Sequence, residues 1–153
     1  MKTFKISVIL TALLWASYVS PSTLARENPI KVNKKDLVCL AQNIYHEARG
    51  EPLEGQIAVA QVTLNRVKSR DFHPTVCGVV YADKQFSWTD EPLKPIQDMK
   101  AWQSSLKIAD AILARKITVS NFKALYFHTK QVNPKWSHKK QIIAKIGNHI
   151  FYS

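Results

Sequence analysis

Three glutamates lie close together in one short segment, Tyr45-His46-Glu47-Ala48-Arg49-Gly50-Glu51-Pro52-Leu53-Glu54. A carboxylic acid can give a proton to a leaving oxygen and later take one back, but only if its surroundings hold its pKa near the working pH. Glu47, Glu51 and Glu54 are therefore the first candidates for acid/base chemistry. The local element around each one decides which is suited to it.

The residues before Glu47 predict a helix that ends beside it. Asn33 occupies an N-cap position and Asp36 follows three residues later, as at many helix starts. Gly50 and Pro52 end the pattern. The apolar positions between them recur at helical spacing: Leu37, Leu40, Ala41, Ile44 and Ala48. Glu47 therefore falls in the last turn of the predicted helix.

Two features of this position would raise the pKa of Glu47. On a helical wheel Glu47 falls beside Leu40, at the edge of the apolar stripe, which predicts partial burial. The helix dipole also disfavours negative charge in the last turn. Both effects favour the protonated carboxyl. The alternative is a boundary residue in a salt bridge with Arg49 or a lysine.

A zinc site is not predicted at this helix. His46-Glu47-Ala48-Arg49-Gly50 resembles the start of a zinc-protease H-E-x-x-H helix, but Gly50 stands where the second histidine ligand would be. No other cluster in the sequence replaces that ligand, and the nucleotide-binding and serine-hydrolase patterns are also missing. We therefore expect no metal and no cofactor.

The remaining elements predict an α+β fold, with helices first and a small antiparallel sheet late. A second helix over residues 52–70 is apolar around most of its circumference, as in a buried central helix. A third is expected over 99–116, and residues 76–81 are consistent with helix or strand. Aromatic-rich runs over 124–128 and 146–152 predict strands, and a loop over 82–95 carries Phe86 and Trp88.

The first 25 residues read as a secretory signal peptide. Lys2 and Lys5 precede an apolar run over residues 6–19, and small residues lead to Ala25, where cleavage is expected. A retained anchor is the alternative, but the run is shorter than the roughly 20 residues needed to cross a bilayer. We therefore expect one exported domain over 26–153, in the periplasm or the extracellular envelope, without a stable membrane span.

The charge of the chain predicts a polyanionic partner. Its formal net charge is +11, and loss of Lys2 and Lys5 with the signal leaves +9. Such a balance suits nucleic acid, an anionic membrane surface or a bacterial wall polymer. Export makes nucleic acid the weakest of these, and we expect none.

Cys39 and Cys77 form an even pair in a chain that is expected to be exported. This favours one disulfide, closing a loop of about 38 residues. Two separate buried thiols are the alternative, because free cysteine packs as a small apolar residue.

Several stretches, in order, together match one known pattern. They are residues 40–52, 54–56, 59–67 and 75–81, then Gln85-Phe86-Ser87-Trp88, Asn133-Pro134-x-Trp136 and Lys145-Ile146-Gly147-Asn148-His149-Ile150-Phe151-Tyr152. They resemble the SleB-like cell wall hydrolase family, the spore-cortex-lytic enzymes and their relatives in other bacteria and phages. The likeness covers nearly all of residues 26–153.

The resemblance implies a lysozyme-like α+β domain that acts on the glycan strands of peptidoglycan. It places the catalytic acid/base at Glu47 and implies a lytic transglycosylase, in which one carboxyl protonates the glycosidic oxygen and then assists attack by the sugar's own 6-hydroxyl. Standard glycoside hydrolysis uses two carboxylates instead. Glu51, in a pre-proline turn, and Glu54, in the first turn of a helix, suit structural roles better.

The resemblance also implies a sugar-binding groove. Core packing is the alternative for its rings, and is favoured for Phe127 and Phe151, while His149 is expected to be a hydrogen-bonded structural residue. The candidate substrate-binding residues are Tyr45, Glu51, Gln85, Phe86, Ser87, Trp88, Tyr126, His128, Asn133 and Asn148.

Other readings of the sequence stay open. A muramidase-type hydrolase or an N-acetylmuramoyl-L-alanine amidase would act on the same polymer. A non-catalytic, basic envelope-binding protein would use only the charge and the aromatic residues. In the leading interpretation the partner is the peptidoglycan glycan strand, bound by a monomer.

Overall fold

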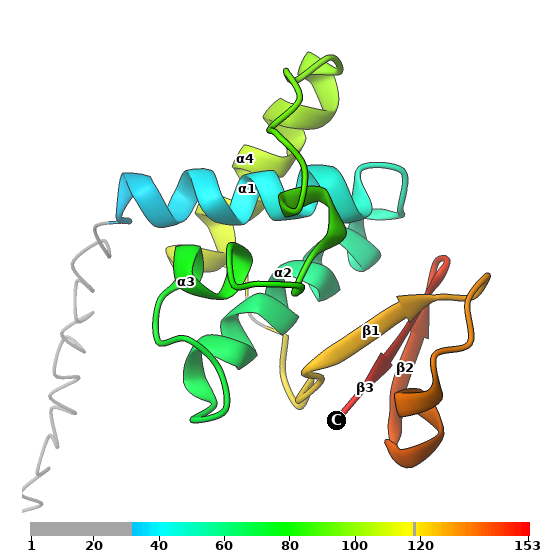
Figure 1. Cartoon of the computed structure of the whole chain (residues 1–153). Helices are drawn as coiled ribbons and strands as arrows, with labels where there is room; N and C mark the ends of the chain where they lie inside the picture. The colour runs from blue at the N-terminus through cyan, green and yellow to red at the C-terminus, as the bar shows by residue number, and fades with distance from the viewer. Residues whose placement is uncertain (1–31, 118) are drawn as a thin grey trace, which may run out of the picture.

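The computed structural model describes residues 32–117 and 119–153 (Figure 1). Within these residues the four α-helices precede the three strands, which confirms the predicted α+β fold. The elements are α1 (Lys34–Ala48), α2 (Leu53–Lys68), α3 (Val76–Val80), the 3₁₀ helix η1 (Ser87–Thr89), α4 (Met99–Leu113), β1 (Tyr126–Thr129), the 3₁₀ helix η2 (Lys135–Lys139), β2 (Ile142–Ile146) and β3 (His149–Tyr152).

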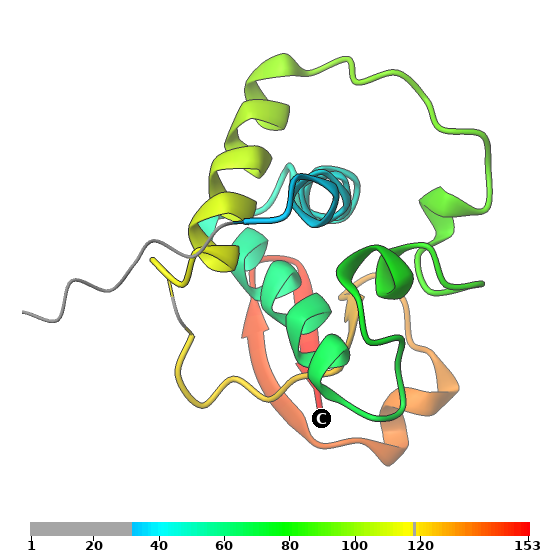
Figure 2. The ribbon, with the colours of Figure 1, turned by 90° about the vertical axis from the view of Figure 1, so that its left-hand side faces the viewer.

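Helix α1 begins and ends as its sequence predicts. The side chain of Asn33 accepts a hydrogen bond from the backbone N–H of Lys35 at 2.9 Å and so caps the first turn. The helix ends at Ala48, with Arg49 as its C-cap. Glu47 therefore lies in the last turn. Figure 2 views α1 end-on, with α4 beside it.

Helix α2 is shared by two hydrophobic cores. Ala60 belongs to a core that α1, α3 and α4 complete. Val59 and Val62 belong to a second core, which Ala124 and Phe151 close from the sheet side. In Figure 1 the sheet lies on the side of α2 away from α1. α2 is therefore the central helix that its apolar circumference predicts, because other elements cover it on both sides.

The three strands form one antiparallel sheet in the order β1-β3-β2. β1 pairs with β3 so that Phe127 lies opposite Phe151, and β2 pairs with β3 with an irregularity between Ile142 and Ala144. The single strand expected over 146–152 is wrong in detail. Gly147 has a φ of 55°, so the chain turns there and residues 146–152 contain the end of one strand and the whole of the next.

A disulfide joins α1 to α3. Cys39 and Cys77 are bonded, with their Cα atoms 5.3 Å apart. The ambiguous run over residues 76–81 is helical at this point, and Thr75 caps it by accepting a hydrogen bond from the N–H of Gly78 at 3.1 Å.

The expected signal peptide, residues 1–25, lies outside the described residues. Across the residues that are described, no helix combines the length and the apolar character needed to cross a membrane.

Candidate active site

A cavity of about 200 Å³ lies where the end of α1 meets three other parts of the chain. Glu47 comes from α1 and Arg66 from the last turn of α2. The segment around η1 and strand β1 supply the remaining lining residues: Gln85, Phe86, Ser87 and Phe127. The fold therefore brings Glu47, Gln85, Phe86 and Ser87 together around one cavity.

Glu47 is half-buried in this cavity, and burial raises the pKa of its carboxyl to about 7, although the nearby Arg66 guanidinium lowers it in part. The upward direction agrees with the sequence expectation. The alternative salt bridge is not formed, since within the described residues Glu47 has no ion pair shorter than 4.0 Å. Arg49 instead donates a hydrogen bond to the carbonyl of Tyr45 at 3.2 Å.

Arg66 is a functional candidate that the sequence reasoning missed. It is only 6% exposed, and its Nε donates to the carbonyl of Leu125 at 2.8 Å. Its guanidinium carbon lies 5.2 Å from the ring centroids of both Phe72 and Phe86. The sequence does contain a signal for it, because an arginine among the apolar residues of a helix that is predicted to be central requires a polar or charged partner from another element.

The segment around η1 divides its side chains between the cavity and the helical core. Phe86 lines the cavity but is only 4% exposed. Trp88 faces elsewhere, stacking on His46 with ring centroids 4.3 Å apart. Its Nε1 donates to the side chain of Asn43 at 3.3 Å. Trp88 is therefore outside the cavity that contains Glu47.

Tyr126 and His128 belong to a neighbouring aromatic cluster. His128 Nε2 and the hydroxyl of Tyr152 form a hydrogen bond of 2.7 Å, and Trp136 packs against both strands at the edge of this cluster. The ammonium of Lys140 lies 3.5 Å from the centroid of the Tyr126 ring. Asn133 is exposed in the loop before η2. None of these residues lines the cavity around Glu47.

Glu51 is used in a structural contact. Its carboxylate accepts hydrogen bonds from the backbone N–H of Asn148 at 2.8 Å and from its side-chain amide at 3.2 Å. His149 is buried beside it, 3.9 Å from the carboxylate, but its Nδ1 has no hydrogen-bond partner in the described part of the chain. The expected hydrogen bond of His149 at that nitrogen is thus missing, and burial lowers its pKa.

Tyr45 lies in the helical core. It is 5% exposed, and its hydroxyl accepts a hydrogen bond from the backbone N–H of Asp98 at 3.2 Å, just before α4. Its ring also meets Trp102 edge-on, at 6.2 Å between centroids. These contacts position α1 against α4 and leave Tyr45 outside the cavity.

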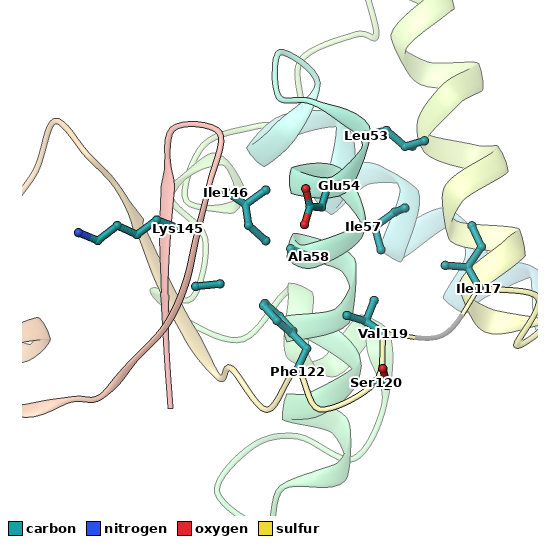
Figure 3. A pocket seen from close by; sticks show the side chains of 11 residues that line it. Leu53, Glu54, Ile57, Ala58, Ile117, Val119, Ser120, Phe122, Lys145 and Ile146 are labelled. Atoms are coloured by element: carbon teal, nitrogen blue, oxygen red, sulfur yellow. The ribbon is translucent and has the colours of Figure 1, made fainter.

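A larger groove of about 810 Å³ lies along the first half of α2 (Figure 3). Leu53, Ile57, Phe122 and Ile146 make most of it apolar. The carboxyl that reaches it, Glu54, is exposed. The smaller cavity is therefore the better candidate for an active site, because its carboxyl, Glu47, is half-buried and lies close to the guanidinium of Arg66.

Residues 32–117 and 119–153 contain no group of three or more histidine, cysteine, aspartate or glutamate side chains placed to hold a metal ion.

Comparison with known proteins gives a consistent result. Residues 50–152 match the Cell Wall Hydrolase family, a range that begins three residues after Glu47. The spore cortex-lytic enzyme of Bacillus cereus is 34% identical over 134 residues, which cover 86% of this chain and 49% of the relative. That of Bacillus subtilis is 33% identical over 128 residues, covering 84% and 41%. The chain spans about half the length of these relatives or less.

Two solved structures share the fold. The catalytic domain of the Bacillus cereus SleB protein is 32% identical with a TM-score of 0.63, over 82% of this chain and 94% of that domain. The catalytic domain of the germination-specific lytic transglycosylase SleB from Bacillus anthracis is 33% identical with a TM-score of 0.65, over 82% and 100%. With the family match over most of its length, this chain belongs to the cell wall hydrolase family.

Proposed function

We propose that this protein cleaves the glycan strands of peptidoglycan as a lytic transglycosylase, with Glu47 as the acid and then the base. The observation that carries the proposal is one half-buried carboxyl, with a pKa of about 7, in a cavity that also presents Gln85 and Ser87. The function named for the Bacillus anthracis relative supports the reaction type. At neutral pH such a carboxyl can both give and accept a proton.

The reaction needs only this carboxyl. Protonated Glu47 gives its proton to the oxygen that links N-acetylmuramic acid to N-acetylglucosamine, and the bond from C1 to that oxygen breaks with its electrons going to the oxygen. The 6-hydroxyl of the muramic acid then bonds to C1 and passes its proton to the Glu47 carboxylate. The products are a free 4-hydroxyl and a 1,6-anhydro end. A second carboxylate, as in ordinary glycoside hydrolysis, is not required.

The polar groups beside Glu47 would orient the sugar. Gln85 and Ser87 can form hydrogen bonds with hydroxyl and acetamide groups, and Phe86 and Phe127 form the apolar wall. Tyr126, His128 and Asn133 would contact more distant units of the strand. Tyr45, Glu51, Trp88 and Asn148 would act by positioning, because each is engaged by other parts of the protein.

The proposal includes export. A signal over residues 1–25 would direct a single domain to the periplasm or the extracellular envelope, where the polymer lies. There the enzyme would act as a monomer, and its net positive charge would favour binding to an anionic wall.

Clearing of a peptidoglycan suspension tests the assignment of Glu47. The purified chain should lower the turbidity, and Glu47→Gln should abolish this, because an amide cannot give a proton at neutral pH. Glu54→Gln is the matched control, since Glu54 is exposed and lies outside the cavity, and it should clear normally. Clearing by Glu47→Gln at the normal rate would show that Glu47 is not the acid.

Mass spectrometry of the released fragments separates the candidate activities. Anhydro-muropeptides are expected from a transglycosylase, whereas reducing ends would indicate a muramidase-type hydrolase. Free stem peptides with intact glycan would indicate an amidase. Binding to walls without any soluble fragment would favour the non-catalytic envelope-binding protein.

A further inference from the structure

Arg66 is held rigidly at the wall of the cavity that contains Glu47. Its Nε donates to the carbonyl of Leu125 at 2.8 Å, just before β1. Its guanidinium carbon lies 5.2 Å from the ring centroid of Phe72 and 5.2 Å from that of Phe86. Three contacts from three parts of the chain thus fix a charged group that is 6% exposed.

The hydrogen bond from Arg66 to the carbonyl of Leu125 does not require a charged donor. Asn65, the preceding residue, already joins α2 to the same stretch of backbone by donating to the carbonyls of Phe122 and Ala124 at 2.8 and 3.0 Å. Moreover, Nη1 of Arg66 is buried without a hydrogen-bond partner among the described residues. Burial of a cation with an unused donor is unfavourable, so a structural role alone gives no reason for the charge.

We propose that Arg66 is the positioning residue of the acid, holding the negative charge that Glu47 acquires whenever its proton leaves. This inference rests on the proposed function of Glu47. After protonation of the glycosidic oxygen, the site contains a carboxylate that must persist until the 6-hydroxyl returns a proton. A guanidinium fixed at the same cavity stabilises that carboxylate without moving.

The electrostatics of the cavity agree with this role. Burial raises the pKa of Glu47, while Arg66 is the charged group that lowers it again, to a net value of about 7. Burial lowers the pKa of Arg66 to about 10, whereas Tyr126 and Glu47 act in the opposite direction, so Arg66 remains charged at neutral pH.

Among the described residues that line the cavity, the other elements contribute no further charge. The segment around η1 presents Gln85, Phe86 and Ser87, and β1 presents Phe127, all of them uncharged. On α1 itself, His46 stacks on Trp88 and Arg49 lies over the ring of Tyr45. Arg66 is therefore the group whose removal should change the proton affinity of Glu47.

The test is a carboxyl titration of the full chain by carbon-13 NMR, with the Glu47 signal identified by its loss in Glu47→Gln. Arg66→Gln keeps a donor for the Leu125 carbonyl but removes the charge, and it should raise the pKa of Glu47 by about one pH unit or more. Arg66→Lys keeps the charge and should leave that pKa near 7. The rate of wall clearing should fall roughly tenfold or more in Arg66→Gln and less in Arg66→Lys.

Asn65→Ala is the matched control. It removes a neighbouring link between α2 and the same backbone segment, so it should lower thermal stability without changing the pKa of Glu47. If Arg66→Gln likewise lowers only stability, or if Arg66→Lys raises the pKa as a neutral residue would, the proposal is overturned. Retained wall-clearing activity in Glu47→Gln would instead refute the proposed function. The titration measures only the pKa of Glu47, so the two outcomes can be told apart.

Discussion

Glu47 makes the stability of the protein depend on pH. Burial raises its pKa from 4.5 to about 7, so the folded protein binds this proton more tightly than the unfolded chain does. The contribution of Glu47 to the free energy of unfolding is therefore fully present below about pH 4.5 and is lost as the pH rises through 7. The protonated form that the proposed reaction requires at its start is also the form that the fold stabilises.

Replacement of Glu47 by glutamine should increase stability in alkaline solution. At pH 9 the variant no longer has a buried carboxylate, so its free energy of unfolding should exceed that of the parent by about 2 to 3 kcal/mol. At pH 4 the difference should be small, because the carboxyl of the parent is then protonated in the folded state. Urea unfolding at the two pH values measures this, and an equal change at both would contradict it.

The sequence predicts some residues of the site better than others. Helical periodicity places Glu47 in the last turn of α1, at the edge of the apolar stripe, and the family resemblance is what assigns it as the acid. The role of Arg66 depends on residues distant in the chain, since Glu47, Phe86 and Leu125 meet it only in the folded protein. The same limit applies to Trp88, whose loop sequence does not reveal that it stacks on α1.

At the scale of elements, the β2–β3 turn is anchored to the loop between α1 and α2. Glu51 in that loop accepts hydrogen bonds from both the backbone N–H and the side-chain amide of Asn148. Gly147 makes the approach possible, because its φ of 55° suits glycine and because a Cβ at this position would collide with the Glu51 carboxylate. The anchor places the sheet against the end of the helix that carries Glu47.

Gly147→Ala should lower the free energy of unfolding by about 2 kcal/mol, through a strained φ and displacement of Glu51. Gly50→Ala is the control in the facing loop, because a Cβ there meets nothing within 4 Å and the residue lacks a positive φ. Denaturant titration of both variants measures the difference. Equal midpoints for the two would show that the turn is not tightly anchored.

The helices were easier to predict than the strands. Asn33 and the apolar periodicity give the start of α1 and the burial of both α1 and α2 correctly. β2 was missed because Ile142–Ile146 is partly exposed, with an irregular register, so it shows no clean alternation. The turn at Gly147 lies inside the aromatic-rich run, so the sequence pattern suggests one strand where the structure has a two-strand hairpin.

At the scale of the whole molecule, the site belongs to neither half alone. Glu47 and Arg66 come from the helices, while Phe127 comes from the sheet. The predicted α+β fold and the family resemblance are both confirmed by the structure and by the related catalytic domains. The convergence of these three residues on one cavity follows from α2, which has the helical core on one side and the sheet core on the other.

That shared helix has a thermodynamic consequence. If the helices or the sheet separated from α2, one apolar side of α2 would become exposed to solvent. Because this exposure is unfavourable, a half-folded intermediate should be scarcely populated. Variants that keep a single tryptophan, Trp102 in α4 or Trp136 in η2, would report the two layers separately by fluorescence. Their unfolding midpoints in urea should coincide. The protein would then lose the proposed site in one all-or-none event, with no populated stage in which the sheet has separated while Glu47 keeps its place in α1.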